Sequence, residues 1–309
     1  MKKKILVIIG GRGIGDLIYH LPLLRSLYKT YGKKIYIFSN RVNQATKVYK
    51  NEKFYEKIIE FNNEKFNIFK TFINIINFKK KINIFKFDEI ILTSNTKRLL
   101  IPVILSNASV KKIFGIGKFI LNKDNSLNHL TVSKKIIKYT NDLKLNKKED
   151  NFYLNSINSI NSNKKIKNLN KIIFISVDSH HDQNNWKIDN FIKIISILLK
   201  KNKIFVNFSP NKKYFFRFFP KEIKESKNVE FTYNRKILDI IKIINSSDVV
   251  IGNESGPVCL GSSLKKKIHA IYEPIHTQPE SRIINKMNKY YNTKNLSSKK
   301  IIHKIINSI

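Results

Sequence analysis

The stretch from residue 5 to residue 25 constrains the fold more than any other. An apolar run, Ile5–Ile9, leads into a turn dense in glycine and then into a helical pattern that begins near Asp16. Four of the chain's ten glycines lie between positions 10 and 15, where tolerance of positive φ angles and of close backbone approach suits a tight turn. A strand, a polar turn and a helix in this order predict a parallel α/β sheet with a binding site at the turn.

The same alternation of apolar runs and helical patterns continues to the C-terminus. In the first half we expect strands at 4–9, 34–38, 57–60, 88–92 and 111–114, and helices at 17–31, 41–49, 64–82, 97–105 and 131–143. In the second half we expect strands at 171–177, 204–208, 229–232, 248–251 and 267–272, and helices at 188–200, 212–219, 235–245, 256–264 and 297–308. Short apolar strands between helices are typical of parallel sheets that are buried on both faces.

The stretch 155–170 interrupts this alternation. It is rich in Asn, Ser and Lys with isolated isoleucines, a composition typical of a linker. We therefore expect an N-terminal Rossmann-like domain over 1–154, a linker over 155–170 and a C-terminal Rossmann-like domain over 171–309. The chain length suits two domains of about 150 residues each.

The basic composition admits two interpretations. The formal net charge is +37, and all but seven of the 59 basic residues are lysines scattered among many Asn and Ile residues, as expected from an AT-rich genome. Nucleic-acid binders concentrate arginine and carry a recognisable module, so we expect no nucleic-acid partner. Contact with an anionic membrane surface stays open, because lysines near such a surface bind it favourably.

Cysteine content and hydropathy exclude several classes of protein. The single Cys259 excludes an intrachain disulfide and a metal site made of several cysteines. No apolar run approaches the roughly 18 residues that a membrane span needs. The five apolar residues after Lys4 are too few for a signal peptide, so we expect a cytoplasmic protein.

The glycine turn does not carry a dinucleotide-binding fingerprint. In the pattern Gly-x-Gly-x-x-Gly, the third glycine is replaced by Asp16 when the count starts at Gly11, and by Ile18 when it starts at Gly13. A carboxylate at this place also disfavours a bound anion. Asp16 is therefore either the N-cap of the following helix or a catalytic base. The sequence alone favours neither role over the other.

Two polar loops in the second half are candidates for binding. The first, at 176–187, contains Ser179, two histidines too isolated to indicate a metal, and Trp186, which we expect to pack with Phe191 on the next helix. The second runs from a strand through Glu254 into a helix that opens at Ser255. Backbone N–H groups at such a helix start can hold a diphosphate, and the carboxylate can bind sugar hydroxyls. The alternative for the second loop is an ordinary capped helix.

These motifs together resemble glycosyltransferase family 9, the heptosyltransferase-like family of bacterial lipopolysaccharide synthesis. The matching residues, in order along nearly the whole chain, are Gly15, Asp16, Pro22, Leu24 and Arg25, then Trp186 and Phe191, then 252–257 with Leu260. The resemblance implies a GT-B architecture, with two Rossmann-like domains whose parallel sheets face each other across a cleft. It also implies inverting transfer from a nucleotide-sugar donor without a metal or another cofactor. The sequence contains no Asp-x-Asp pair, in agreement with metal independence.

By the same resemblance, Asp16 is the general base that takes the proton from the acceptor hydroxyl. The loop around it, with Arg12, Gly13 and Gly15, lies on the acceptor side. The donor side is assigned to Asn253, Glu254, Ser255, Gly256, Ser179 and Lys187. The implied acceptor is a lipid-linked saccharide or an oligosaccharide, and peripheral contact with the inner membrane face is a hypothesis that stays open.

The donor side departs from the family pattern. Asn184 and Lys187 stand where the family has lysine and proline, Cys259 replaces a common histidine, and 273–275 read Glu-Pro-Ile in place of Gly-Pro-Thr. Lys187 or His276 is the candidate for the missing positive charge. The donor sugar therefore stays open, heptose included. Two alternatives remain: a nucleotide-sugar epimerase on the same architecture, and a degenerate, non-catalytic binding protein.

Overall fold

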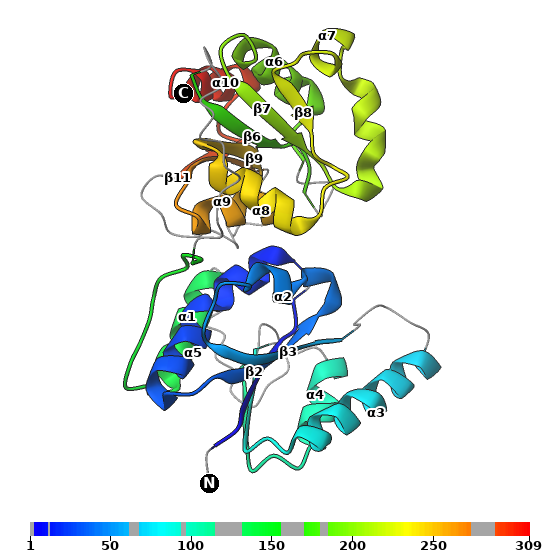
Figure 1. The fold of residues 1–309 in the computed structure, drawn as a ribbon, viewed down its shortest axis with the longest axis vertical. Helices are drawn as coiled ribbons and strands as arrows, with labels where there is room; N and C mark the ends of the chain where they lie inside the picture. The colour runs from blue at the N-terminus through cyan, green and yellow to red at the C-terminus, as the bar shows by residue number, and fades with distance from the viewer. Residues whose placement is uncertain are drawn as a thin grey trace. The chain divides into compact units, whose positions relative to one another are not determined.

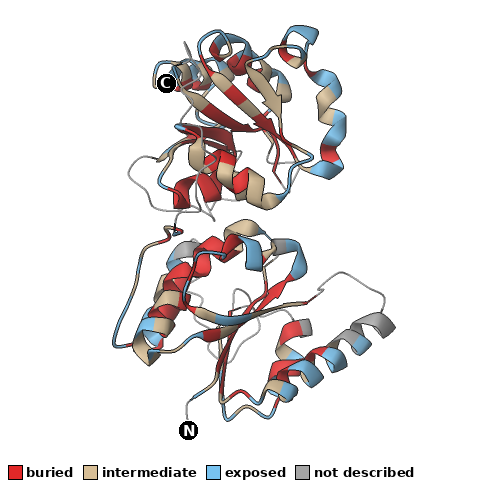
Figure 2. Ribbon diagram, in the orientation of Figure 1, coloured by how far each residue is buried: buried red, intermediate tan, exposed pale blue. Residues whose placement is uncertain are grey.

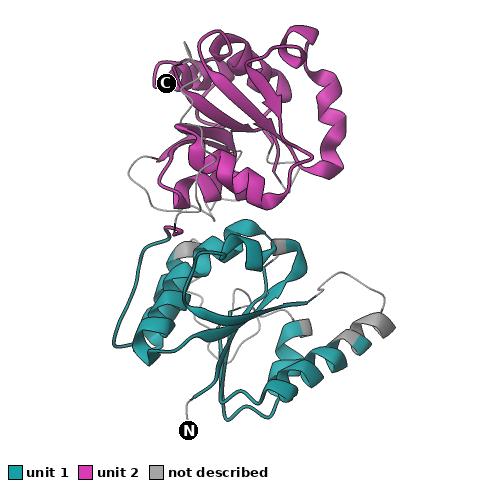
Figure 3. Cartoon of the chain, in the orientation of Figure 1, with its two compact units in different colours: residues 1–152 teal, residues 153–309 magenta. Residues whose placement is uncertain are grey.

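The computed structural model describes residues 3–11, 13–61, 68–93, 97–114, 132–155, 170–179, 185–272 and 288–309. They form two compact units, residues 1–152 and 153–309 (Figure 3). Each unit is built around its own parallel sheet. The predicted linker over 155–170 lies almost entirely outside the described residues.

Unit 1 contains a five-stranded parallel sheet in the order β3-β2-β1-β4-β5 (Figure 1). Its strands are β1 (Ile5–Ile9), β2 (Ile35–Asn40), β3 (Tyr55–Phe61), β4 (Glu89–Leu92) and β5 (Val110–Ile113). Its helices are α1 (Ile14–Tyr31), the 3₁₀ helix η1 (Arg41–Asn43), α2 (Ala45–Val48), α3 (Ile68–Phe85), α4 (Lys97–Ile104) and α5 (Val132–Asp142). Helix α1 contacts α5, and α3 contacts α4 on the other side of the sheet.

Unit 2 contains a six-stranded parallel sheet in the order β11-β10-β9-β6-β7-β8. Its strands are β6 (Ile172–Ser176), β7 (Lys203–Asn207), β8 (Val229–Phe231), β9 (Val249–Asn253), β10 (Lys267–Tyr272) and β11 (Asn288–Asn292). Its helices are α6 (Ile188–Leu198), the 3₁₀ helix η4 (Pro210–Phe218), α7 (Lys221–Lys224), α8 (Ile237–Ser246), α9 (Gly256–Ser263) and α10 (Ser298–Ile306).

The central strands are buried along their whole length in both units (Figure 2). This explains why they read as uninterrupted apolar runs, because strands covered on both faces have no polar side. In unit 1, Phe38 of β2 meets Phe78 of α3 edge to face, with ring centroids 5.0 Å apart. In unit 2, Phe191 of α6 packs in one cluster with Ile301 and Ile305 of α10.

All ten predicted strands are present, each within two residues of its predicted bounds. The single helix predicted at 41–49 is wrong, because Gln44 adopts a left-handed φ of 51° and separates η1 from α2. The helix predicted at 212–219 is the 3₁₀ helix η4. Strand β11 and the one-turn helix α7 were not predicted. The β11 sequence, Asn-Lys-Tyr-Tyr-Asn, lacks an apolar run because β11 is an edge strand with one buried residue, Tyr291.

Candidate functional site

Each sheet has one place where its strand order reverses, and both candidate turns lie there. In unit 1 the neighbours β1 and β4 continue into the glycine turn and into Thr93. In unit 2 the neighbours β6 and β9 continue into Val177 and into Glu254. Crevices at the carboxyl ends of strands flanking such a switch point are where open α/β sheets bind ligands.

Asp16 occupies the first turn of α1, at its third position. The N-cap is Gly13, so the N-cap alternative for Asp16 is wrong. Instead, Asp16 Oδ2 accepts a 2.8 Å hydrogen bond from the Gly13 backbone N–H, the returning half of a capping box. A methyl group on Gly11 would lie 2.1 Å from Asp16 Cγ. Any side chain at position 11 would therefore have to displace the Asp16 carboxylate.

The remaining glycine-turn residues follow from the same geometry. Gly13 has extended backbone angles, φ −98° and ψ 154°, and Gly15 lies within the first turn of α1. Gly13 thus contacts the Asp16 carboxylate directly, and Gly15 is the residue before Asp16 in α1. Arg12, which was assigned to the acceptor-side loop, lies outside the described residues.

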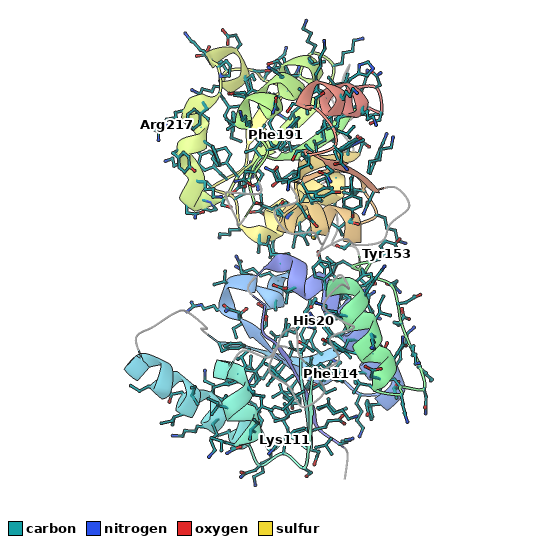
Figure 4. All side chains as sticks on the ribbon, turned by 180° about the vertical axis from the view of Figure 1, so that it is seen from behind. His20, Lys111, Phe114, Tyr153, Phe191 and Arg217 are labelled. Atoms are coloured by element: carbon teal, nitrogen blue, oxygen red, sulfur yellow. The ribbon has the colours of Figure 1, made fainter. Side chains whose placement is uncertain are left out.

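His20, one helical turn after Asp16, was missed by sequence reasoning (Figure 4). Its side chain is buried, and Nδ1 lies 2.5 Å from the Asp16 carbonyl oxygen, to which it must donate. Nε2 lies 2.7 Å from Thr93 Oγ1, which in turn is 2.9 Å from the carbonyl oxygen of Ile8. His20 therefore links the start of α1 to the ends of both strands at the switch point. Burial lowers the pKa of the imidazole, which favours the neutral form of the ring.

On the donor side, Ser255 is the N-cap of α9 and Gly256 is its first residue. Ser255 Oγ lies 3.5 Å from Ser176 Oγ at the end of the neighbouring strand β6. Ser176 packs directly on Gly252, where a methyl group would lie 2.5 Å from the Ser176 carbonyl oxygen. The Glu254 backbone N–H donates to the Ile271 carbonyl at 3.0 Å, which continues the ladder between β9 and β10 up to the turn.

Asn253 is fully buried and holds the two donor-side loops together. Its Nδ2 donates to the Val177 carbonyl at 2.8 Å, and its Oδ1 accepts from the Trp186 backbone N–H at 2.8 Å. Trp186 packs edge to face on Phe191 with ring centroids 5.1 Å apart, which confirms the packing role predicted for both rings. The geometry gives Asn253 a positioning role within the predicted donor side.

A buried pair of opposite charges beside Ser179 was also missed by sequence reasoning. Lys212 Nζ donates to the Ser179 carbonyl at 2.7 Å and lies 3.9 Å from Asp178 Oδ2. Asp178 Oδ2 also accepts the Ser209 backbone N–H at 3.1 Å. Burial raises the pKa of Asp178, against the opposing effect of the Ser209 hydrogen bonds and the Lys212 charge. Since most basic residues of the chain are lysines, no local signal distinguishes Lys212 from the others.

The other predicted donor-side residues divide into two groups. Ser179 is buried and its backbone N–H donates to Asn185 Oδ1 at 2.7 Å, whereas Lys187 is the exposed N-cap of α6. Ser179, Ser255 and Lys187 thus lie in the segments that follow β6 and β9, and Asn253 is the last residue of β9 itself. His180, His181, Asn184, Glu273, Pro274, Ile275 and His276 lie outside the described residues.

The described part of the chain shows neither a cluster of metal-ligating side chains nor a membrane-spanning helix. Within the described ranges, no three His, Cys, Asp or Glu side chains cluster as metal ligands would. None of the helices in these ranges is long and apolar enough to span a bilayer.

Comparison with known proteins gives the fold. No protein-family model and no curated protein sequence matches this chain. Among solved structures, the glycosyltransferase family 9 protein from Veillonella parvula DSM 2008 matches with a TM-score of 0.73 at 15% identity, over 100% of this chain and 91% of that one. E. coli heptosyltransferase WaaC with ADP matches with a TM-score of 0.70 at 11% identity, over 99% and 100%.

A UDP-N-acetylglucosamine 2-epimerase is also similar, with a TM-score of 0.52 at 14% identity, over 99% of this chain and 87% of the epimerase. At such low sequence identities, these three similarities show a shared fold. The predicted α/β class with two Rossmann-like parallel sheets, the GT-B type of fold, is confirmed. The predicted resemblance to glycosyltransferase family 9 is confirmed at this level.

Proposed function

We propose that this protein is a glycosyltransferase that moves a sugar from a nucleotide-sugar donor to a hydroxyl group of a saccharide acceptor. One observation carries the proposal: each of the two sheets has a polar turn at its switch point, and the two turns differ in chemistry. The turn in unit 1 presents the Asp16 carboxylate, whereas the turn in unit 2 presents a helix N-terminus. A base for the acceptor and an anion site for the donor are the two elements that sugar transfer requires.

Asp16 is the general base in this proposal. Its Oδ2 is fixed by the Gly13 N–H at 2.8 Å, and the His20 ring fixes the backbone of the same helical turn through the Asp16 carbonyl. The acceptor oxygen attacks the anomeric carbon while Asp16 takes its proton, and the bond from that carbon to the donor phosphate breaks. A positioned base of this kind contributes about 10²–10⁴-fold to the rate.

The donor diphosphate is assigned to the N-terminus of α9. Backbone N–H groups at Gly256 and Val258 point from the first turn of α9, and such groups with the helix dipole stabilise negative charge. The leaving nucleoside diphosphate gains charge as the bond breaks, so this stabilisation is strongest in the transition state. Ser255 and Glu254 are assigned to donor oxygens, with Ser179 and Lys187 in the adjoining loop.

The finer assignments follow the resemblance to family 9 and belong to the same proposal. Transfer is inverting because one base and one leaving group act in a single displacement, and it requires no metal because α9 carries the phosphate charge. Residues 1–154 serve the acceptor and residues 171–309 the donor. The acceptor is a lipid-linked saccharide or oligosaccharide of a bacterial cell surface, and the enzyme works in the cytoplasm.

The test starts with a thermal-shift screen of nucleotide sugars, because a ligand bound only by the folded state raises the melting temperature. The donor found is then used with saccharide acceptors to compare Asp16→Asn with Asp189→Asn. Asp189 is an exposed acid in the first turn of α6 and so provides a matched control. We expect Asp16→Asn to lose about 10²-fold or more in kcat with an unchanged donor shift, and Asp189→Asn to retain activity.

Three results would contradict the proposal in different ways. Unchanged turnover in Asp16→Asn removes this residue from the mechanism. Conversion of the donor without any acceptor identifies the protein as an epimerase, the activity of one of the structures with a similar fold. The absence of both transfer and donor binding across the panel favours a non-catalytic protein.

A further inference from the structure

Helix α3 exposes an unusual stripe of isoleucines. Ile73, Ile76 and Ile84 are 42%, 49% and 65% exposed, and with the exposed Lys80 they recur at intervals of three and four residues, which places them on one face of the helix. The opposite face, with Phe78 and Ile82, is buried in the core of unit 1. The exposed face of α3 (Figure 2) therefore carries large apolar side chains that do not contribute to the core that the helix helps to form.

The end of α4 continues this apolar surface. Ile101, Ile104 and Leu105 are 40%, 52% and 51% exposed. The two helices lie side by side, and the loop after α4 is joined to α3 by a 3.2 Å hydrogen bond from the Asn107 N–H to Asn83 Oδ1. Asn83 directly precedes Ile84, and Asn107 follows Leu105 by two positions. The exposed ends of α3 and α4 therefore adjoin.

We call this the α3–α4 surface and define it by Ile73, Ile76, Lys80, Lys81, Ile84, Lys86, Ile101, Ile104, Leu105 and Lys111. In the described part of the chain, seven of the eleven exposed large hydrophobic residues fall between Ile73 and Val110. Single exposed apolar side chains need no explanation, but a concentration of them marks an interaction site.

The same surface is strongly cationic. The described residues of 68–114 include nine lysines and arginines but only two acids, Asp88 and Glu89. Glu89 is fully buried between Lys3 and Lys112, at 2.6 and 2.9 Å. Asp88 is half-buried, and its Oδ2 accepts the Lys4 backbone N–H at 2.6 Å. The acids are thus held in the fold, whereas Lys80, Lys81, Lys86 and Lys111 are exposed.

A cavity of about 320 Å³ lies at the junction of the two helices, with Asn83, Lys86, Asn107 and Ser109 among its lining residues. Lys111 Nζ donates to the Ile104 carbonyl at 2.8 Å, so this lysine lies beside the exposed end of α4. Lys86 and Lys111 thus lie next to the exposed apolar side chains where the ends of α3 and α4 meet.

We propose that the α3–α4 surface docks on an anionic lipid bilayer. Isoleucines that enter the interface between head groups and acyl chains lose their contact with water, while flanking lysines remain at the level of the lipid phosphates. A second copy of this chain fits the surface less well, because it would place cationic faces against each other. A nucleic acid would meet the lysines but offers nothing apolar to the isoleucines. Docking goes beyond the proposed function, because it requires neither the donor nor Asp16.

The test is co-sedimentation of the full chain with vesicles of phosphatidylglycerol and phosphatidylethanolamine in equal parts, compared with vesicles of phosphatidylcholine. We expect binding to the first only, weakened by salt, since salt screens exposed charges. Replacing Lys80 and Lys81 by Gln is expected to weaken binding roughly 30-fold, as two lysines near an anionic leaflet would. Replacing Ile76 and Ile84 by Glu is expected to abolish it.

Matched controls come from unit 2. Ile197 on α6 is 50% exposed, so Ile197→Glu repeats the Ile76→Glu change at equal exposure. Lys200 and Lys201 form an exposed pair after the same helix, and their change to Gln repeats the lysine substitution. Both control variants are expected to bind as the unchanged protein does, and so is Asp16→Asn. Equal thermal midpoints establish that each variant is folded.

Three outcomes overturn the proposal. Equal binding to both kinds of vesicle, or equal loss in the control variants, shows that the charge of the whole molecule acts rather than this surface. A dimer in solution that Ile76→Glu dissociates assigns the surface to a second copy. Tight binding of a single-stranded oligonucleotide that depends on the lysines but not on the isoleucines assigns it to nucleic acid. None of these results bears on donor binding, which the thermal-shift screen measures separately.

Discussion

Asn253→Ala removes the residue that joins three segments of unit 2. The Asn253 amide is fully buried at the end of β9, and it bonds the backbone carbonyl after β6 and the backbone N–H of Trp186, both at 2.8 Å. The alanine side chain has no polar atom. Because the side chain at position 253 is 0% exposed, water does not replace the two lost hydrogen bonds. The carbonyl of Val177 and the N–H of Trp186 would both lose their partner.

The magnitude follows from these two orphaned groups. A buried backbone group left without its hydrogen bond costs about 1–3 kcal/mol, so the pair costs roughly 2–6 kcal/mol. For a unit of this size, 1 kcal/mol shifts the melting temperature by about 2–4 °C. We expect the transition of unit 2 to fall by about 10 °C. The donor-dependent shift should also shrink, because the Trp186 loop and the turn before α9 are no longer fixed to each other.

The assay is differential scanning calorimetry with Asn190→Ala as the control. Asn190 is similarly buried, but its Nδ2 donates to a single side-chain oxygen, Ser298 Oγ, at 3.1 Å. That hydroxyl keeps the Trp186 Nε1–H as a partner at 3.1 Å, so we expect a loss of about 0.5–1.5 kcal/mol. If Asn253→Ala melts within about 2 °C of Asn190→Ala, the reasoning about the two backbone groups is refuted.

Two further predictions concern unit 1. Gly11→Ala should abolish transfer at near-normal stability, because its methyl group would displace the Asp16 carboxylate. Gly13→Ala is the control: its methyl group would lie at an ordinary 3.4 Å from Asp16 Oδ2, so this variant should stay active. Equal turnover in the two variants would disprove the role of the close approach at Gly11. Burial opposes ionisation of Glu89, but its two lysine partners outweigh burial and lower its pKa, so Glu89→Gln should cost about 1–3 kcal/mol at neutral pH. The folded pKa of Glu89 lies below the unfolded value of 4.5. The difference in unfolding free energy between the unchanged protein and Glu89→Gln should therefore be complete above pH 4.5 and vanish as the pH falls through the folded pKa. A difference that stays constant in urea denaturation down to acid pH would contradict this prediction.

The strands and helices could be predicted because their signals are local. The core strands of both units are apolar along their length, and the helix at α8 shows its buried face at three- and four-residue spacing. Local sequence patterns failed to predict the structure where a backbone angle or a strand pairing determines it. No residue type near Gln44 predicts its left-handed φ. Strand β11 forms by pairing with β10 and not because its own sequence is hydrophobic.

The candidate site divides in the same way. The closeness of Asp16 to Gly13 follows from three residues of helical spacing, and the sequence also placed the turn at Glu254–Gly256 before a helix. The assignment of these residues to a base and to donor binding stays a prediction. The buried contacts of His20 with Thr93 and of Lys212 with Asp178 were not predicted.

The sequence by itself determined the alternation of strands and helices, the two glycine-bearing turns and the position of Asp16 at the first of them, because each depends on neighbours within a few residues. Only the tertiary structure decided which strand ends adjoin. The strand order places β9 beside β6, so Asn253 reaches a carbonyl 76 residues away. It also places β4 beside β1, so His20 reaches Thr93 across 73 residues. Such contacts depend on how crossovers pack helices against a sheet, and no local pattern of side chains records that choice.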